Sequence, residues 1–404
     1  MKTTFNQIFS NVLELKGKTL TDVATMPQRT LQALRREAAA QVMAKLSTIR
    51  TLRIEQEKKA LEIQAAKVGM SKKKPSTVEL EPTKSAKPKG QAKKFSLAET
   101  FGLNVPKSVT ITLNNHNPKH PLVPKADPNY VFRSSNVSDL CTFLQLEGET
   151  FMYVYGPTGC GKSSLIIEAA ARMGIPLYVV TGHSRMETPE LIGTYKLNKD
   201  GGMDWIPGPV TAAALEDCWV LIDEIDLLDP AAVAGLNGVT EGRSYVVPET
   251  GELIVPGPNF RIFATGNTSG AGDKTGLYQG TLQQNLAFMD RAFTAEFAYP
   301  DADVEVGILE KVAPTMLQEF RERMVKFANE IREQFINGQI EVTLSTRTLV
   351  RWARTASFYK AAWANAKGAP EPMLHAFDRS LGFRAEKESR QALHEVYQRH
   401  FGTI

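Results

Sequence analysis

Short apolar segments alternate with longer amphipathic segments through the middle of the chain. Five runs have the length and the continuous apolar character of buried strands: 151–155, 177–180, 219–222, 260–265 and 295–299. Residues 162–173, between the first two runs, have the pattern of a helix. Short apolar strands separated by helices predict a parallel five-stranded sheet covered on both faces, and therefore an α/β fold.

The pattern differs on either side of this region. Residues 28–67 contain no Gly or Pro and have apolar positions at roughly helical spacing, so a helical arm is predicted at 1–70. After residue 300 the strand signal fades, and three segments have helical patterns: 304–337, 346–366 and 386–400. We therefore expect an α/β domain with its lead-in segment at 95–300 and a C-terminal helical domain at 301–404.

A basic segment at 71–94 separates the arm from the α/β region. It holds eight lysines against two glutamates, a net charge of +6, whereas the whole chain carries +4. Its Lys, Pro and Ser content predicts a disordered linker, because too little apolar surface is available to offset the entropy of ordering. A solvated tether and a lysine arm for nucleic acid both fit this composition. The absence of aromatic residues for stacking on bases favours the tether.

Composition narrows the class of protein further. Of 404 residues, 42% are hydrophobic and 23% charged, as in ordinary globular domains, and no apolar run is long enough to span a membrane. The first residues lack the charged start and apolar stretch of a secretory signal. The three cysteines, at positions 141, 160 and 218, form no CxxC pair. A cytoplasmic location is the expectation.

A phosphate-binding loop follows the first predicted strand. Residues 156–163 read GPTGCGKS and match GxxxxGK[ST], with a strand before the motif and a helix after it. Glycines let backbone N–H groups approach phosphate oxygens, and the helix N-terminus attracts negative charge. Lys162 is expected to reach the β- and γ-phosphates of ATP, and Ser163 to ligate Mg²⁺. The expected nucleotide contacts are Gly156, Pro157, Thr158, Gly159, Cys160, Gly161, Lys162, Ser163 and Ser164.

Two acidic residues end the apolar run at 219–222. A parallel sheet binds ligands at the carboxyl ends of its strands, which is where Asp223 and Glu224 fall. We expect Asp223 to hold Mg²⁺ with Ser163, and Glu224 to act as the general base for the attacking water. Asp226 and Asp229 are assigned to helix capping and solvent.

Asn267 ends another apolar run, at 260–265, that is expected to lie beside the strand of Asp223. From there its side chain is expected to contact both the γ-phosphate and the attacking water. Together with the loop and the acidic pair, it predicts an enzyme that hydrolyses ATP.

Several motifs resemble one family. Residues 270–291, GAGDKTGLYQGTLQQNLAFMDR, look very much like CobS, the AAA+ subunit of aerobic cobaltochelatases. Three shorter stretches are similar to the same family: DPNYVF at 127–132, STRTLVRWA at 345–353 and YQRHFG at 397–402. The phosphate loop and the acidic strand are closer to MoxR-like proteins, which belong with CobS to the MoxR-like and dynein-related AAA+ group.

The resemblance implies roles for particular residues. Asn267 matches sensor 1, Arg291 the arginine finger and Arg347 sensor 2 of an AAA+ core with a C-terminal helical lid. An arginine finger that acts on a neighbour's nucleotide implies a ring, and the family points to six subunits. Two predicted hairpins, at 195–205 and 245–255, match inserts that face the ring pore and partners.

Three functions remain open at this point. The resemblance implies a CobS-like motor that works with a large chelatase-like subunit and a partner with a von Willebrand-type metal-adhesion domain, for cobalt insertion into a corrin ring. The second possible function is that of a MoxR-like chaperone ATPase, which would act with an adhesion-domain partner on an unrelated client. The third is a nucleic-acid motor that uses the basic segment at 71–94.

Overall fold

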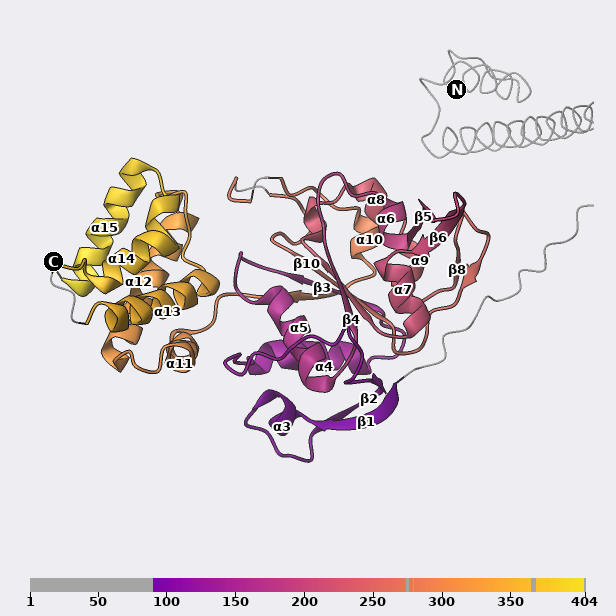
Figure 1. Cartoon of the computed structure of the whole chain (residues 1–404), viewed down its shortest axis with the longest axis horizontal. Coiled ribbons are helices and arrows are strands. Elements are labelled where there is room, and N and C mark those ends of the chain that lie inside the picture. Colours follow the sequence, from indigo (N-terminus) through magenta and orange to yellow (C-terminus); the bar gives the residue numbers. More distant parts are fainter. Residues whose placement is uncertain (1–89, 274–275, 279, 365–367, 403–404) are drawn as a thin grey trace, which may run out of the picture. The chain divides into compact units, whose positions relative to one another are not determined.

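The computed structural model describes residues 90–273, 276–278, 280–364 and 368–402, and the labels of helices and strands follow Figure 1. The arm predicted at 1–70 and the basic segment as far as residue 89 lie outside the described residues.

Five parallel strands form the central sheet, which confirms the α/β prediction. Their spatial order is β11-β3-β10-β7-β4. The bounds are β3 (Phe151–Tyr155), β4 (Leu177–Thr181), β7 (Trp219–Asp223), β10 (Arg261–Gly266) and β11 (Phe293–Glu296). Four strands lie within one residue of the predicted runs, and β11 begins two residues earlier than its run. Because all neighbours are parallel, the strands end at one common edge.

Alternate strand residues face two separate apolar cores, as the two-residue period of a strand requires. On one face, Met152 and Val154 pack with buried side chains of α4 and α5. On the other, Tyr153 and Ile222 pack with residues of α7, α8 and α9. The helices of this domain are α4 (Ser134–Gln145), α5 (Lys162–Met173), α6 (Thr188–Ile192), α7 (Pro209–Glu216), η2 (Ile225–Leu227), α8 (Pro230–Ala234), α9 (Asn237–Thr240) and α10 (Leu286–Met289).

A lead-in hairpin precedes this domain and corrects one prediction. Strand β1 (Gln91–Ser96) pairs antiparallel with β2 (Thr110–His116), and the short helix α3 (Leu97–Phe101) follows β1. The linker prediction was therefore wrong for residues 91–94. Lysines are common on edge strands, and β1 is fixed by Phe95, which is buried opposite Ile111.

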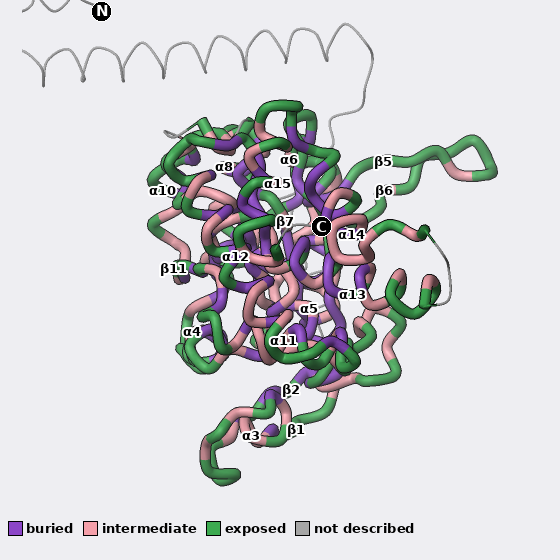
Figure 2. The backbone as a smooth tube through the Cα atoms, turned by 90° about the vertical axis from the view of Figure 1, so that its left-hand side faces the viewer, coloured by how far each residue is buried: buried purple, intermediate pink, exposed green. Residues whose placement is uncertain are grey.

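Five α-helices form the C-terminal part as far as its residues are described. They are α11 (Ala302–Val312), α12 (Gln318–Ile336), α13 (Thr346–Ala362), α14 (Pro372–Ser380) and α15 (Lys387–Phe401), with η3 (Gly382–Arg384) before the last. The single helix expected at 304–337 is two helices, because Pro314 lies in the break between them. These helices share one apolar core, in which Phe327 of α12, Trp352 of α13 and Phe377 of α14 contact one another. Figure 2 shows many buried residues along α13.

Both predicted hairpins are present. Strands β5 (Gly193–Leu197) and β6 (Met203–Pro207) form the first, and the two-residue strands β8 (Tyr245–Val246) and β9 (Leu253–Ile254) form the second. The β5–β6 hairpin extends away from the sheet as a largely exposed segment in Figure 2. No helix in the described residues is both long and apolar enough to cross a membrane.

Candidate active site

The predicted phosphate loop connects the carboxyl end of β3 to the first residue of α5. Gly156 has φ 148°, and a Cβ there would lie 2.0 Å from the carbonyl oxygen of Phe297, so the approach of these two backbones requires glycine. Gly161, with φ 103°, is the N-cap of α5. The loop thus leads directly into the N-terminus of a twelve-residue helix, where anions are favoured.

Cys160 is a buried residue of this loop. Its side chain is 3% exposed, and burial raises the pKa of its thiol above the ordinary value. A buried thiol of raised pKa is a poor nucleophile and reacts slowly with oxidants. Cys160 therefore acts as a small packing residue here.

Lys162 lies at the centre of the predicted site, although it is only 8% exposed. Its Nζ donates hydrogen bonds to the carbonyl oxygens of Gly156 at 2.7 Å and Pro157 at 3.0 Å. It also donates to Oδ1 of Asn267 at 3.0 Å. Burial lowers the pKa of Lys162 from its ordinary value. The structure thus brings together two residues that lie 105 positions apart in the sequence.

The hydroxyl and the carboxylate expected to hold Mg²⁺ are also adjacent. Ser163 Oγ donates to Asp223 Oδ1 at 2.6 Å. The hydroxyl of Thr265, on β10, donates to the same carboxylate oxygen and also accepts a hydrogen bond from the backbone N–H of Glu224 at 3.2 Å. The sequence pattern alone did not single out Thr265, although its place near the end of the strand beside that of Asp223 was a usable signal.

Glu224 has an unusual backbone conformation. Its φ of 59° and ψ of 44° lie in the left-handed region, which a side chain with a Cβ seldom adopts. Its carboxylate is exposed and forms no hydrogen bond with any described residue. Strained residues of this kind are frequent in active sites, where the surroundings fix a side chain in a required direction. In this chain the left-handed conformation of Glu224 makes a sharp turn directly after β7.

The assignment of Asp226 to capping and solvent was wrong. Asp226 is fully buried, and its Oδ2 accepts hydrogen bonds from the backbone N–H groups of Asn267 at 2.7 Å and Thr268 at 3.2 Å. Burial raises the pKa of this carboxyl, and those N–H groups oppose the rise. Asp226 therefore holds the turn that carries Asn267. Asp229 does cap a helix, since its side chain accepts from the N–H of Ala231 at the start of α8.

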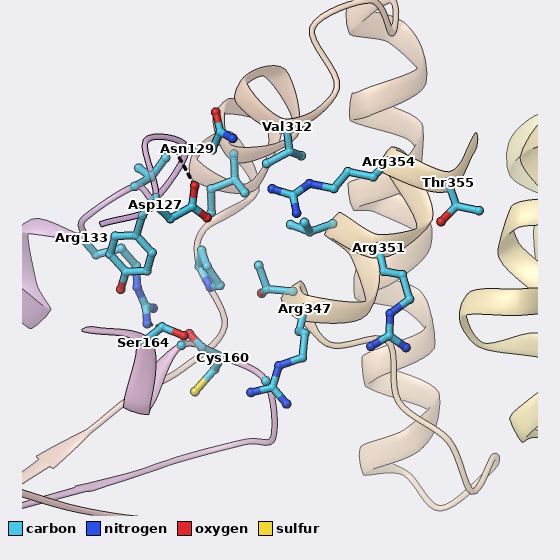
Figure 3. Close-up of a pocket in the computed structure, with 18 residues that line it drawn as sticks. Asp127, Asn129, Arg133, Cys160, Ser164, Val312, Arg347, Arg351, Arg354 and Thr355 are labelled. Atoms are coloured by element: carbon cyan, nitrogen blue, oxygen red, sulfur yellow. Dashed lines mark hydrogen bonds between the residues drawn. The ribbon is translucent and has the colours of Figure 1, made fainter. Parts of the chain in front are cut away.

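A cavity of about 550 Å³ adjoins the phosphate loop. On one side it is lined by Gly159, Cys160 and Gly161 of the loop and by Ser164 of α5, and on the other by α13. Arg347, Arg351 and Arg354 line it from successive turns of α13, as Figure 3 shows. None of these guanidinium groups forms a hydrogen bond or an ion pair with a described residue. The backbone N–H of Arg347 donates to Gly159 O at 3.4 Å, which joins α13 to the loop.

Arg291 is not part of this cluster. It precedes β11, in which Phe293 pairs with Met152 of β3, so it lies near the amino ends of the strands. The phosphate loop follows their carboxyl ends, and the five residues of β3 span about 16 Å. Arg291 Nε donates to Glu241 Oε1 at 2.5 Å, and its NH1 donates to the carbonyl oxygen of Ala287. The structure therefore separates Arg291 from the phosphate loop of its own chain.

Comparison with known proteins identifies the family. The AAA domain of the dynein-related subfamily matches residues 152–282, and the C-terminal domain of the CbbQ/NirQ/NorQ group matches residues 305–400. The chain belongs to the dynein-related AAA ATPases.

Two curated relatives and one solved structure are similar to this ATPase. The aerobic cobaltochelatase subunit CobS from Sinorhizobium sp is 30% identical over 319 residues, 76% of this chain and 90% of that protein. Protein NorQ from Paracoccus denitrificans (strain Pd 1222) is 31% identical over 234 residues, 56% of this chain and 77% of that protein. The solved structure is the RuvB Holliday junction branch migration motor from Thermotoga maritima, which is 15% identical with a TM-score of 0.41. The match covers 64% of this chain and 72% of that one.

The local chemistry of this ATPase suits a nucleotide with Mg²⁺. A hydroxyl and a carboxylate oxygen in contact, from Ser163 and Asp223, are the hard oxygen donors that Mg²⁺ prefers. Lys162 and the N-terminus of α5 suit phosphate oxygens. Three guanidinium groups of α13, which pair with no described residue, add positive charge to the adjacent cavity.

We expect substitution of Asp226 to affect turnover, unlike substitution of its neighbour Asp229. Asp226→Ala leaves buried N–H groups without an acceptor, so it should cost about 1–3 kcal/mol of stability. It should also lower kcat by about tenfold, because Asn267 loses its support. Asp229→Ala, the matched control, should cost about 0.5–2 kcal/mol through the lost cap and leave kcat unchanged. Chemical unfolding and steady-state ATPase assays measure both. Equal turnover in the two variants would contradict this role of Asp226.

Proposed function

We propose that this ATPase is a subunit of a ring, and that each active site is completed by Arg291 from the neighbouring subunit. The observation that carries the proposal is the position of Arg291 at the amino ends of the strands, away from the phosphate loop of its own chain. A head-to-tail ring brings opposite surfaces of identical subunits together at every interface. The resemblance to CobS supports a ring of six.

Within each site, different residues of the same chain bind the phosphates, hold the metal and activate the water. Lys162 and the loop from Gly156 to Ser164 bind the phosphates, and bound Mg²⁺, held by Ser163 and Asp223, would neutralise their charge. Glu224 accepts a proton from the attacking water. Asn267, linked to Lys162, orients that water, and Arg347 binds the phosphates from the lid side.

We propose further that the ring remodels a chelatase-type partner complex during cobalt insertion into a corrin ring. The similarity to CobS over 90% of that protein supports this client. The expected partners are a large chelatase-like subunit and a protein with a von Willebrand-type metal-adhesion domain. The β5–β6 hairpin offers them an exposed surface, since Leu197 is 74% and Met203 66% exposed.

The similarity to NorQ favours a second candidate. NorQ matches 56% of this chain at 31% identity, and the C-terminal domain match includes the NorQ group by name. In this alternative the same motor, with an adhesion-domain partner, acts as a MoxR-like chaperone on an unrelated protein complex.

A substrate trap distinguishes the two clients. Tagged Glu224→Gln is purified with ATP from its own cells, and Lys162→Ala, which should bind ATP weakly, serves as the matched control. A large chelatase-like subunit retained by the trap alone supports the cobaltochelatase proposal. An adhesion-domain protein retained with an unrelated complex, and without a chelatase-like subunit, contradicts it and supports the alternative.

The basic segment should contribute little to the ATPase reaction. Deleting 71–89 should change turnover without a client by less than tenfold, or about 1.4 kcal/mol in the barrier, because no site residue lies there. Deleting 71–94 should also lower the unfolding temperature, because it removes residues of β1 that pair with β2. Steep stimulation by DNA at low salt, present in the intact chain and lost on deleting 71–89, would instead support the nucleic-acid motor.

A further inference from the structure

Glu241 joins two arginines at the edge of the sheet where Arg291 lies. It follows the last residue of α9, and its side chain is 24% exposed. Oε1 accepts from Nε of Arg291 at 2.5 Å, and Oε2 pairs with NH2 of Arg243 at 2.6 Å. The hydrogen bonds of Lys162 and Ser163 lie at the other edge, so the candidate active site of the same chain makes no use of this carboxylate.

We infer that Glu241 is a positioning residue for Arg291, one that fixes its guanidinium for the active site of the neighbouring subunit. The inference rests on the proposed ring. It adds a carboxylate to the machinery of hydrolysis, although that carboxylate itself touches no substrate.

The direction of the hydrogen bonds supports this role. Glu241 holds the guanidinium by Nε, and the carbonyl oxygen of Ala287 holds NH1. NH2 forms no hydrogen bond with a described residue, so it is available to an oxygen of another chain. Hydrogen bonds at two N–H groups restrict the conformations of the long Arg291 side chain before the neighbour's phosphate binds. The entropy of ordering this side chain is then not lost at the catalytic step.

The backbone on either side of this ion pair packs against the sheet. Phe288 of α10 is buried against Phe151 of β3, with ring centroids 4.9 Å apart. Asn285 caps α10 through the N–H of Ala287. On the other side, Gly242 lies so close to Thr150 that a Cβ there would be 2.7 Å from its hydroxyl. The segments that carry both partners of the ion pair therefore pack against β3 and the residue before it.

Neighbouring acids do not duplicate this contact. A hollow of about 480 Å³ beside Arg291 is also lined by Glu149 and Asp290, but neither forms an ion pair with Arg291 in the described part of the chain. Arg243 is 75% exposed and shares only the second oxygen of Glu241. Removing Arg243 leaves the Arg291 contact in place, which makes Arg243→Ala a matched control.

Kinetics of single variants give the first test. Glu241→Ala should lower kcat by about ten- to a hundredfold, the usual cost of a misplaced catalytic group, with KM for ATP unchanged. Glu241→Gln keeps an acceptor oxygen and should retain more activity than Glu241→Ala. Arg243→Ala should stay within about twofold of the unaltered protein, since the Arg291 contact remains. In an Arg291→Ala background, Glu241→Ala should have no further effect.

Mixed rings separate positioning from a general loss of stability. Glu241→Ala mixed with Lys162→Ala should regain activity, since intact Arg291–Glu241 pairs then face intact phosphate loops. Glu241→Ala mixed with Arg291→Ala should be no faster than Glu241→Ala alone, because no subunit supplies a positioned arginine. A rate in this second mixture above that of Glu241→Ala alone, or near-normal kcat in Glu241→Ala alone, would overturn the inference. The mixture of Arg291→Ala with Lys162→Ala tests the ring separately. If that mixture regains activity in the same assay, the role of Glu241 can fail while the proposed ring still stands.

Discussion

Arg291→Ala is expected to abolish most ATP hydrolysis while leaving ATP binding intact. An arginine supplied to a transferring phosphoryl group is worth about 10³–10⁵ in kcat in related chemistry, because it stabilises charge that develops in the transition state. Arg291 lies outside the cavity beside its own phosphate loop, so nucleotide affinity should not depend on it. Steady-state ATPase rates and equilibrium binding of a fluorescent ATP analogue measure the two quantities.

Arg291→Lys is the informative control for this variant. Lysine keeps the positive charge and the possibility of pairing with Glu241, but it lacks the planar fork of arginine. We expect this variant to hydrolyse ATP much more slowly than the unaltered protein. Near-normal rates for both variants would show that the pair with Glu241 is only structural.

Glu224→Gln should arrest turnover at the chemical step. Removing a general base costs about 10²–10⁴ in rate, and the amide of glutamine cannot take a proton from water. ATP should still bind, because the Glu224 carboxylate forms no hydrogen bond with a described residue of the phosphate loop, and it should persist on the protein unhydrolysed. Lys162→Ala should fail differently, by loss of nucleotide affinity.

Quench-flow and filter-binding experiments distinguish these two failures. Glu224→Gln should retain labelled ATP over many turnover times of the unaltered protein, whereas Lys162→Ala should retain little at the same concentration. Normal turnover in Glu224→Gln would remove Glu224 from the role of general base.

The parts of the site that depend on local sequence could be predicted from the chain alone. The phosphate loop needs glycines, a lysine and a hydroxyl at fixed spacing between a strand and a helix, and 162–173 is helical as predicted. Asp223 and Glu224 end a strand whose apolar run is evident. In these cases the chemistry and the secondary structure lie within a few consecutive residues.

Contacts between distant segments could not be predicted in this way. Asp226 resembles a capping residue in sequence, although it lies within η2. Only the packing of β10 against β7 brings the N–H of Asn267 to its carboxylate. Arg351 and Arg354 were missed because helical periodicity does not show that their side of α13 lines a cavity. The strand at 91–94 was missed because its partner, β2, lies across a loop and lysine-rich composition hides the pairing.

The central claim, that each active site takes Arg291 from the neighbouring subunit, is tested most directly by mixing two inactive variants. Arg291→Ala and Lys162→Ala are combined over a range of ratios under conditions in which subunits exchange, and native mass spectrometry verifies that mixed rings form. At equal amounts, about one quarter of the interfaces should join an intact phosphate loop to an intact Arg291 if mixing is random. We predict that the ATPase rate rises well above that of either variant and is greatest near the equal mixture. Mixed rings that are no faster than their two components would contradict the claim.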